Sequence, residues 1–377
     1  GRLVTPGLVD LHVHLREPGQ EIKETIATGS AAAAAGGFTS ICAMPNTDPV
    51  TDSPERVRFV ADRGCAARGA RVFPIAAATL GSRGETPTDA AALRAAGAVA
   101  LSDDGLPIAT AKVLEQVLAG ARAAGLPVAD HCEDRRLSAG GAILAGPVAE
   151  RLGVGGIPRG AESVAVARDL EVLARAGGRL HLCHLSTGGS AELLRNARQA
   201  GLPVTAETTP HHLALSTELV LEQGALAKMN PPLAGDGDRE ALIAALADGT
   251  IDCIATDHAP HTVAEKAVGL DRAPFGIVGL ETAFGLLHTA LVVSGAIDLV
   301  TLIERITLGP ARAFGLPAGR LAPGDPADVA VFDLAAEWTV EPHLFRSRSR
   351  NTPIAGRRLI GRPILTLVGG EVVYDGR

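Results

Sequence analysis

Hydrophobic and polar residues form short apolar runs that recur along most of the chain, each bounded by glycine or proline. Such runs predict eight strands: Leu8–Leu15, Thr39–Pro45, Arg71–Thr79, Val99–Asp103, Pro127–Glu133, Arg179–Leu185, Pro203–Thr209 and Ile251–His258. Alanine-rich stretches with helical character lie between them, such as Glu21–Ala35 and Glu55–Ala67. This alternation predicts a (β/α)8 TIM-type barrel. An open doubly wound sheet is the alternative, but no G-x-G-x-x-G fingerprint follows the first strand.

The pattern changes after a helical stretch at Leu299–Phe314. From Arg320 to Arg377, short alternating runs predict a small β-rich domain: Asp328–Asp333, Pro363–Val368 and Glu371–Tyr374. We therefore divide the chain into a barrel of residues 1–317 and a β-rich domain of residues 318–377. Because the second segment is too short to form a stable sheet alone, we expect N-terminal strands that are missing from this numbering to complete it.

Charge and cysteine content narrow the class of protein. The chain has 377 residues, with 35 Lys plus Arg against 42 Asp plus Glu, so its net charge of −7 offers no basic surface for nucleic acid or an anionic membrane. The expected partner is a small molecule. The five cysteines are scattered without a C-x-x-C pair, which indicates neither a disulfide framework nor a zinc finger. We find no signal peptide and expect a cytoplasmic protein.

Potential metal ligands gather at the ends of the predicted strands. His12 and His14 are two residues apart, so the period of a strand puts both on one face, where they could share a cation. Two imidazoles alone leave a coordination sphere incomplete, and an H-x-H pair alone is more often two core histidines. Four other strands, however, carry further candidates at their carboxyl ends, where barrel enzymes place their catalytic groups: Ser102–Gly105, Asp130–Asp134, His181–His184 and Thr256–His261.

These motifs resemble the amidohydrolase superfamily and, within it, the bacterial type I dihydroorotases. The resemblance runs over nearly the whole chain and rests on eight segments in order: His12–Gly19, Met44–Thr47, Ser102–Gly105, His131–Asp134, His184–Thr187, Thr209–Leu213, Met229–Leu233 and Asp257–His261. It implies zinc, as one or two ions with two favoured. Asp104 would bridge them, with His12, His14 and Asp257 at one metal and His131 and His184 at the other. One departure is Ala234, where the family has arginine.

The position of one lysine distinguishes the type I dihydroorotases from the related hydantoinases and allantoinases. Hydantoinases and allantoinases generally bridge two metals with a carboxylated lysine after the fourth strand. The only lysine near that position is Lys112, which lies in a helical stretch, Thr110–Ala124, and is interpreted as a solvated helix residue. Strand parity further suggests that Cys132, Cys183 and His181 face the surrounding helices. His211 and His212 are not needed for either metal and are interpreted as structural.

The resemblance also implies roles in substrate binding and proton transfer. Asp257 would carry the proton between the attacking water and the leaving ring nitrogen. Arg16, in phase with His14, would grip a substrate carboxylate through a forked contact. Asn46, Asn230, His261 and the backbone of Pro274, Phe275 and Gly276 would complete the pocket. Three of these residues have a simpler alternative: Arg16 could pair with Glu17 or Glu21, and Asn46 and Asn230 could be turn residues.

The resemblance therefore implies a zinc-dependent enzyme of the dihydroorotase family, which would interconvert N-carbamoyl-L-aspartate and L-dihydroorotate in pyrimidine synthesis. A hydantoinase or allantoinase is the enzymatic alternative, and Arg16 with Asn46 argues against it. The other alternative is an inactive dihydroorotase-like subunit that supports aspartate transcarbamoylase, although such chains usually lose metal ligands. A homodimer and a complex with aspartate transcarbamoylase are the possible assemblies.

Overall fold

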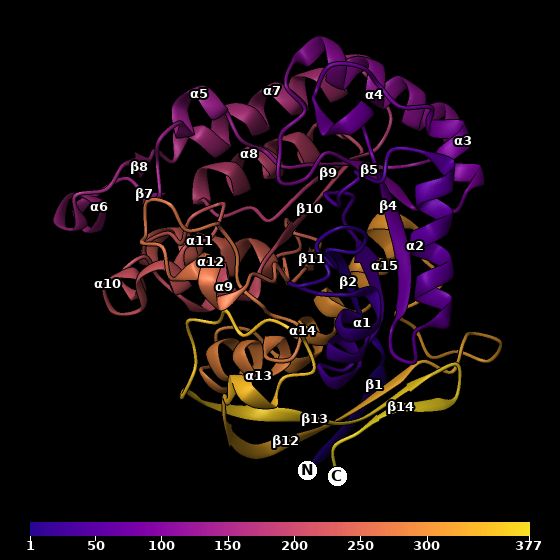
Figure 1. The fold of residues 1–377 in the computed structure, drawn as a ribbon, viewed down its shortest axis with the longest axis vertical. Helices are drawn as coiled ribbons and strands as arrows, with labels where there is room; N and C mark the ends of the chain where they lie inside the picture. The colour runs from indigo at the N-terminus through magenta and orange to yellow at the C-terminus, as the bar shows by residue number, and fades with distance from the viewer.

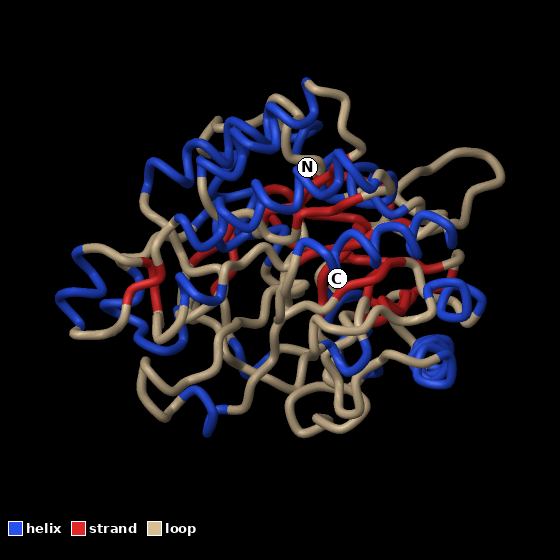
Figure 2. The backbone as a smooth tube through the Cα atoms, turned by 90° about the horizontal axis from the view of Figure 1, so that it is seen from above, coloured by secondary structure: helices blue, strands red, loops and turns tan.

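The computed structural model describes residues 1–377, and its centre is an eight-stranded parallel sheet. The strands follow the order β11-β10-β9-β6-β5-β4-β3-β2, and a parallel bridge between Val13 and His258 joins the two edges of the sheet. Helices surround the strands (Figure 1), and the strands lie in the middle of the molecule when it is seen from above (Figure 2). The predicted barrel is confirmed.

Each predicted strand corresponds to a strand of the barrel, although most are shorter than expected. Their bounds are Leu8–Val13 (β2), Phe38–Ala43 (β3), Arg71–Ala77 (β4), Ala100–Ser102 (β5), Val128–Asp130 (β6), Leu180–Leu182 (β9), Val204–Thr208 (β10) and Cys253–Ile254 (β11). A separate two-stranded ribbon, Ile143–Leu144 (β7) with Gly156–Ile157 (β8), follows β6 and carries the helix Pro147–Leu152 (α6) at the left of Figure 1.

Helices alternate with the barrel strands. The longer ones are Ile26–Ala35 (α1), Pro54–Ala66 (α2), Ala90–Ala95 (α3), Ala111–Ala124 (α4), Gly160–Ala176 (α7), Gly188–Gln199 (α8), Asp236–Ala247 (α11), Leu299–Ile306 (α14) and Leu308–Phe314 (α15). Shorter helices are Arg135–Ser138 (α5), Pro210–Ala214 (α9), Leu219–Gln223 (α10), Val263–Lys266 (α12) and Ala283–Leu287 (α13), which continues into a π-helical turn at His288–Val293.

The start of α1 differs from the sequence prediction. We expected the helix to begin at Glu21, but it begins at Ile26, where Thr25 forms a capping box with Thr28. The residues before the cap form turns, and they place the carboxylate of Glu24 in the interior, fully buried. A helix that began at Glu21 would have required a helical backbone at Glu24, where the backbone is not helical.

The second sheet is antiparallel, with the order β1-β12-β13-β14. Its strands are Arg2–Pro6 (β1), Val329–Thr339 (β12), Arg358–Val368 (β13) and Glu371–Asp375 (β14). The chain's first strand therefore pairs with its C-terminal region, and both termini lie beside this sheet in Figure 1. The domain boundaries at residues 317 and 318 stay a prediction.

Two clusters of apolar residues show which side chains point into the barrel and which point toward the surrounding helices. We call them the inner and the outer cluster. Leu180 and Leu182 of β9 belong to the large cluster between strands and helices, whereas Cys183 packs in the inner cluster with Phe314 of α15. The ring of His181 also contacts Phe314, at a centroid distance of 5.2 Å. The prediction that His181 and Cys183 face the helices is wrong. Cys132 does face them, because its Sγ contacts Asp169 of α7.

Candidate functional site

A bulge near the end of β2 aims both histidines of the first motif into the barrel. Leu11 packs in the inner cluster and Val13 in the outer one, and the register between β2 and β3 shifts between Asp10 and Val13. His12 and His14 then lie with their ring centroids 5.3 Å apart. Both side chains are buried.

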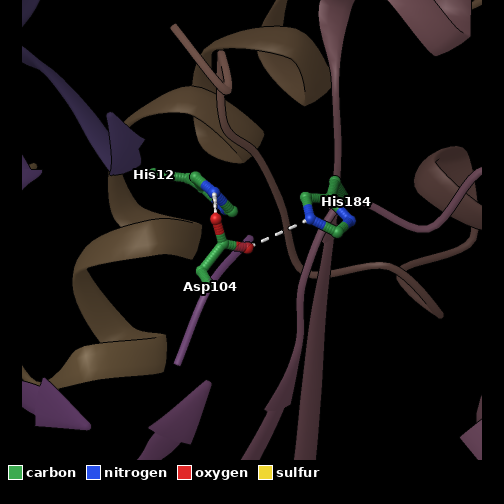
Figure 3. Close-up of side chains that lie close together, drawn as sticks. All are labelled: His12, Asp104 and His184. Carbon is green, nitrogen blue, oxygen red and sulfur yellow. Dashed lines mark hydrogen bonds and ion pairs between the residues drawn. The ribbon is translucent and has the colours of Figure 1, made fainter. Parts of the chain in front are cut away.

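Asp104 lies at the centre of four imidazoles. Its Oδ2 is 3.2 Å from His12 Nε2 and 3.5 Å from His14 Nε2, while its Oδ1 is 3.4 Å from His131 Nδ1 and 3.3 Å from His184 Nε2. Figure 3 shows the carboxylate between His12 and His184. One oxygen thus faces each pair of histidines, which is the arrangement expected of a carboxylate that bridges two cations.

Asp257 completes the cluster on the side of the first pair. Its Oδ1 lies 3.1 Å from His14 Nε2 and 3.6 Å from His12 Nε2. The structure therefore brings the six predicted ligands together. His184 and Asp257 both have positive backbone φ angles, 34° and 47°, which direct their side chains inward just after the strands end.

Three of the four imidazoles bind an acceptor through the nitrogen that points away from the cluster. His12 Nδ1 is 2.7 Å from Glu207 Oε1, His14 Nδ1 is 2.8 Å from Asn46 Oδ1, and His131 Nε2 is 3.2 Å from Glu133 Oε2. Because these oxygens only accept, the imidazole nitrogens facing them carry the protons. The lone pairs on the opposite nitrogens are then directed at Asp104, as metal-binding histidines require.

The pKa shifts indicate that the cluster favours positive charge. Burial acts to raise the pKa of Asp104, but the imidazole of His12 and hydrogen bonds from the other histidines outweigh it and hold that pKa well below its usual range. Burial likewise acts to lower the pKa of His131, yet hydrogen bonds with Asp104 and Glu133 raise it to about 10. Both shifts show that positive charge beside Asp104 is favourable.

The donor set fits a metal ion such as zinc. His12 Nε2 is fully buried and has no hydrogen-bond partner, although three carboxylates surround the ring. Nitrogen and carboxylate oxygen donors, with no thiolate among the six, suit zinc and related divalent ions. A cation would satisfy these lone pairs together.

The predicted substrate residues line one cavity beside the cluster. It has a volume of 310 Å³, and Arg16, Asn46, Asn230, His261, Pro274, Phe275 and Gly276 line it together with the predicted ligands His14, Asp104, His131, His184 and Asp257. Asn230 Nδ2 lies 3.1 Å from His131 Nε2 and 3.2 Å from Glu133 Oε2. Asn46 therefore accepts from His14, and Asn230 donates to Glu133, which is the acceptor of His131. A turn role alone does not explain these contacts.

Arg16 is buried in this cavity without a carboxylate partner. Its Nε donates to the carbonyl of Pro260 at 3.3 Å, and its Nη2 lies 3.5 Å from His261 Nε2. The alternative of a pair with Glu17 or Glu21 is wrong, because Glu17 binds Arg63 and Glu21 accepts from the backbone of Gly19. Burial lowers the pKa of Arg16 to about 10, against the attraction of Asp257 and Asp104. A guanidinium in such a place is suited to bind an anionic group of a ligand.

Sequence reasoning missed Glu207 and left Glu133 without a role. Glu207, the last residue but one of β10, also binds His181 through Oε2 at 3.1 Å, so it joins two imidazoles inside the barrel. A lone carboxylate within a predicted strand has no spacing signal that could reveal this contact. His212 has the structural role that we predicted, since its two nitrogens bind Thr209 Oγ1 and the carbonyl of Pro231.

An eight-stranded barrel with histidines and carboxylates at its strand ends defines a metal-dependent amidohydrolase, and the comparisons identify which kind. A family model described as dihydro-orotase-like matches residues 1–190. A dihydroorotase from Anaeromyxobacter sp. (strain K) is 54% identical over 376 residues, which cover 99% of this chain and 87% of that protein. One from Bacillus caldolyticus is 51% identical over 375 residues, covering 100% and 88%. The chain belongs to the dihydroorotase family.

Solved structures of hydantoinases, which are cyclic amidases, have the same fold as this chain. L-Hydantoinase from Arthrobacter aurescens superposes with a TM-score of 0.90 at 26% identity, covering 100% of this chain and 86% of that one. D-Hydantoinase from Thermus sp. gives a TM-score of 0.83 at 25% identity, with the same coverage. The chain is therefore a hydrolase of cyclic amides. No helix in the structure combines the length and the apolar composition that a membrane span requires.

Proposed function

We propose that this chain interconverts L-dihydroorotate and N-carbamoyl-L-aspartate, with zinc held by His12, His14, Asp104, His131, His184 and Asp257. The observation that best supports this proposal is the position of Arg16. Its guanidinium is buried, without a carboxylate partner, in the wall of the cavity beside the cluster of predicted metal ligands. Dihydroorotate is a cyclic amide that bears a carboxylate, so it offers both the scissile bond and the anion. When bound, the metal supplies Lewis acidity and makes water more acidic.

The side chains then divide the work of ring opening. Arg16 holds the substrate carboxylate and so orients the ring. Asn46 accepts from His14, and Asn230 donates to Glu133, which in turn accepts from His131, so both asparagines help to keep the imidazoles in place. Asp257 accepts the proton of the attacking water as the new bond to the carbonyl carbon forms. It delivers that proton to the ring nitrogen as the C–N bond breaks. In the biosynthetic direction the same carboxylate takes a proton from the carbamoyl nitrogen.

A two-metal site bridged by Asp104 is part of the proposal. Its two oxygens face separate pairs of histidines, which supports a bridging role. The hydantoinase alternative lacks support at Lys112, which is exposed on α4. The inactive-subunit alternative is disfavoured because none of the six ligand positions is lost. A cytoplasmic location, a homodimer and association with aspartate transcarbamoylase remain predictions.

The test measures metal content and dihydroorotate hydrolysis on the same preparation. We expect turnover with about two metal ions per chain, and loss of turnover after chelation that zinc restores. Arg16→Gln should lower kcat/KM by about ten- to a hundredfold, mostly through KM, because charge-assisted hydrogen bonds contribute roughly 1.5–3 kcal/mol.

Asp257→Asn should instead lower kcat by about a hundredfold or more, since an amide cannot accept the proton. Metal content must be measured for this variant as well, because Asp257 is also a proposed ligand. Turnover of hydantoin but not of dihydroorotate by the metal-loaded wild-type protein would contradict the proposal and favour the hydantoinase alternative.

A further inference from the structure

A segment between β12 and β13, residues 346–351, lies against the barrel. The carboxylate of Glu281 accepts hydrogen bonds from the backbone nitrogens of Arg346 and Ser347, and Glu24 accepts one from Arg348. Ser349 Oγ donates to the carbonyl of Lys23 at 2.7 Å. These hydrogen bonds hold this part of the C-terminal region against the barrel. Asn351 is the last residue of the segment.

The amide of Asn351 joins two backbone strips that line the substrate cavity. Its Oδ1 accepts from the backbone nitrogen of His261 at 3.0 Å, and its Nδ2 donates to the carbonyls of Ala259 at 3.0 Å and Gly276 at 3.1 Å. Both amide protons and one oxygen lone pair are therefore used. Asn351 is itself buried, at 3% exposure, and does not line the cavity.

Lys266 holds the second of these strips from behind. Its Nζ donates to the carbonyls of Pro274 at 2.9 Å, Gly276 at 3.0 Å and Lys228 at 3.3 Å. Three carbonyl acceptors match the three protons of an ammonium group, and no carboxylate takes part. Gly276 therefore accepts from both Lys266 and Asn351. The strip cannot shift without breaking bonds to at least one of these side chains.

The two strips meet the carboxylate-binding side of the cavity through His261. Its Nε2 lies 2.8 Å from the carbonyl of Phe275 and 3.5 Å from Arg16 Nη2. The strips also pack tightly, since a Cβ at Gly276 would lie 2.5 Å from that of Ala259. The position of the wall beside Arg16 is thus set by side chains that do not line the cavity themselves.

We propose that Asn351 and Lys266 are positioning residues that hold the wall formed by Ala259, His261 and Pro274–Gly276 in register with Arg16, and so set substrate affinity. The inference rests on the proposed function, because it takes Arg16 as the group that binds the substrate carboxylate. It also gives the C-terminal region a part in the active site of the barrel. Neither residue contacts a predicted metal ligand.

The kinetic test compares Asn351→Ala and Lys266→Met with wild-type protein at full metal loading. We expect KM for dihydroorotate to rise about tenfold or more in each variant, because small displacements of binding groups cost up to about a hundredfold. We expect kcat to change by less than about threefold and metal content to stay unchanged, since the cluster is untouched. Unchanged KM in both variants, or a fall in kcat alone, would overturn the proposal.

Ser349→Ala is the matched control, because it removes one bond between the same segment and the barrel but none to the cavity wall. It should keep the wild-type KM. An equal rise of KM in this control would show that the segment acts only through general stability. If Asn351→Ala does not fold, the KM of Lys266→Met still tests whether the position of the wall sets substrate affinity.

Amide hydrogen exchange provides a readout that does not depend on activity. In Asn351→Ala, peptides that contain His261 should exchange faster than in wild-type protein, while those from β2 to β6 should not change. Identical exchange at His261 would overturn the proposal even if KM rises. If wild-type protein does not turn over dihydroorotate at full metal loading, the proposed function fails instead, and exchange at His261 still decides whether Asn351 holds the wall.

Discussion

His184 illustrates why individual side chains escape a rule based on strand period. Taking His184 as an inward ligand, alternation predicts that Cys183 faces outward and that His181, three residues earlier, does as well. In the structure β9 ends at Leu182, and a φ of 34° at His184 turns its side chain inward after the strand has ended. Arg16 and Asp257 have similar angles, 62° and 47°. Such conformations are strained for residues other than glycine, and they gather at functional sites.

Glu207 is the residue whose role only the folded barrel reveals. The sequence places it within a predicted strand, but its contacts with His12 and His181 join β10 to β2 and β9. Both partners push its pKa downward, against burial, to about 2, so the carboxylate is ionised at neutral pH. It therefore accepts the Nδ1 proton of His12, which would leave Nε2 as the nitrogen that binds a cation.

Glu207→Gln should weaken metal binding by about ten- to a hundredfold, because an amide cannot accept from both imidazoles at once. Competition with a chromogenic chelator measures this affinity directly, without an activity assay. Glu192→Gln is the matched control, since Glu192 lies on the surface of α8 and binds only Arg195. Equal metal affinity in Glu207→Gln and wild-type protein would contradict an orienting role.

At the level of elements, the sequence predicted the order of strands well and their ends less well. The expected strands Val99–Asp103 and Pro127–Glu133 are Ala100–Ser102 and Val128–Asp130 in the structure. In both cases the strand ends within two residues of a predicted ligand, Asp104 or His131. Apolar periodicity finds the strand but contains no information on where the ligand loop begins.

The position of α4 supports Asp104 rather than Lys112 as the proposed bridging residue. β5 ends at Ser102, and α4 begins only at Ala111, so Lys112 lies on an exposed turn of a helix outside the barrel. Lys112→Ala should therefore retain metal content and turnover, and intact-protein mass should show no carbon dioxide adduct. Asp104→Asn, as the comparison, should lose metal. Loss of metal in Lys112→Ala would instead favour a carboxylated lysine and the hydantoinase class.

The whole molecule shares one apolar core between the barrel and the small sheet. Phe332 of β12 stacks on Phe284 of α13 with ring centroids 3.9 Å apart, and both are fully buried. Phe332 and Ala330 belong to the same cluster as the outer faces of the barrel strands. Apolar alternation predicted a β-rich unit at the C-terminal end, but it could not show that the faces of this unit pack on barrel helices.

Because of this shared core, we expect the barrel and the small sheet to unfold together. Phe332→Ala should lower the free energy of unfolding by about 3–5 kcal/mol, since it leaves a cavity between the sheet and α13. Phe59→Ala is the control: Phe59 is 39% exposed on α2, and its loss should change stability by no more than about 0.5 kcal/mol. Calorimetry and circular dichroism should give one transition for both variants, shifted only for Phe332→Ala. Two separate transitions, with the barrel melting at its wild-type temperature, would show that the small sheet is an independent unit.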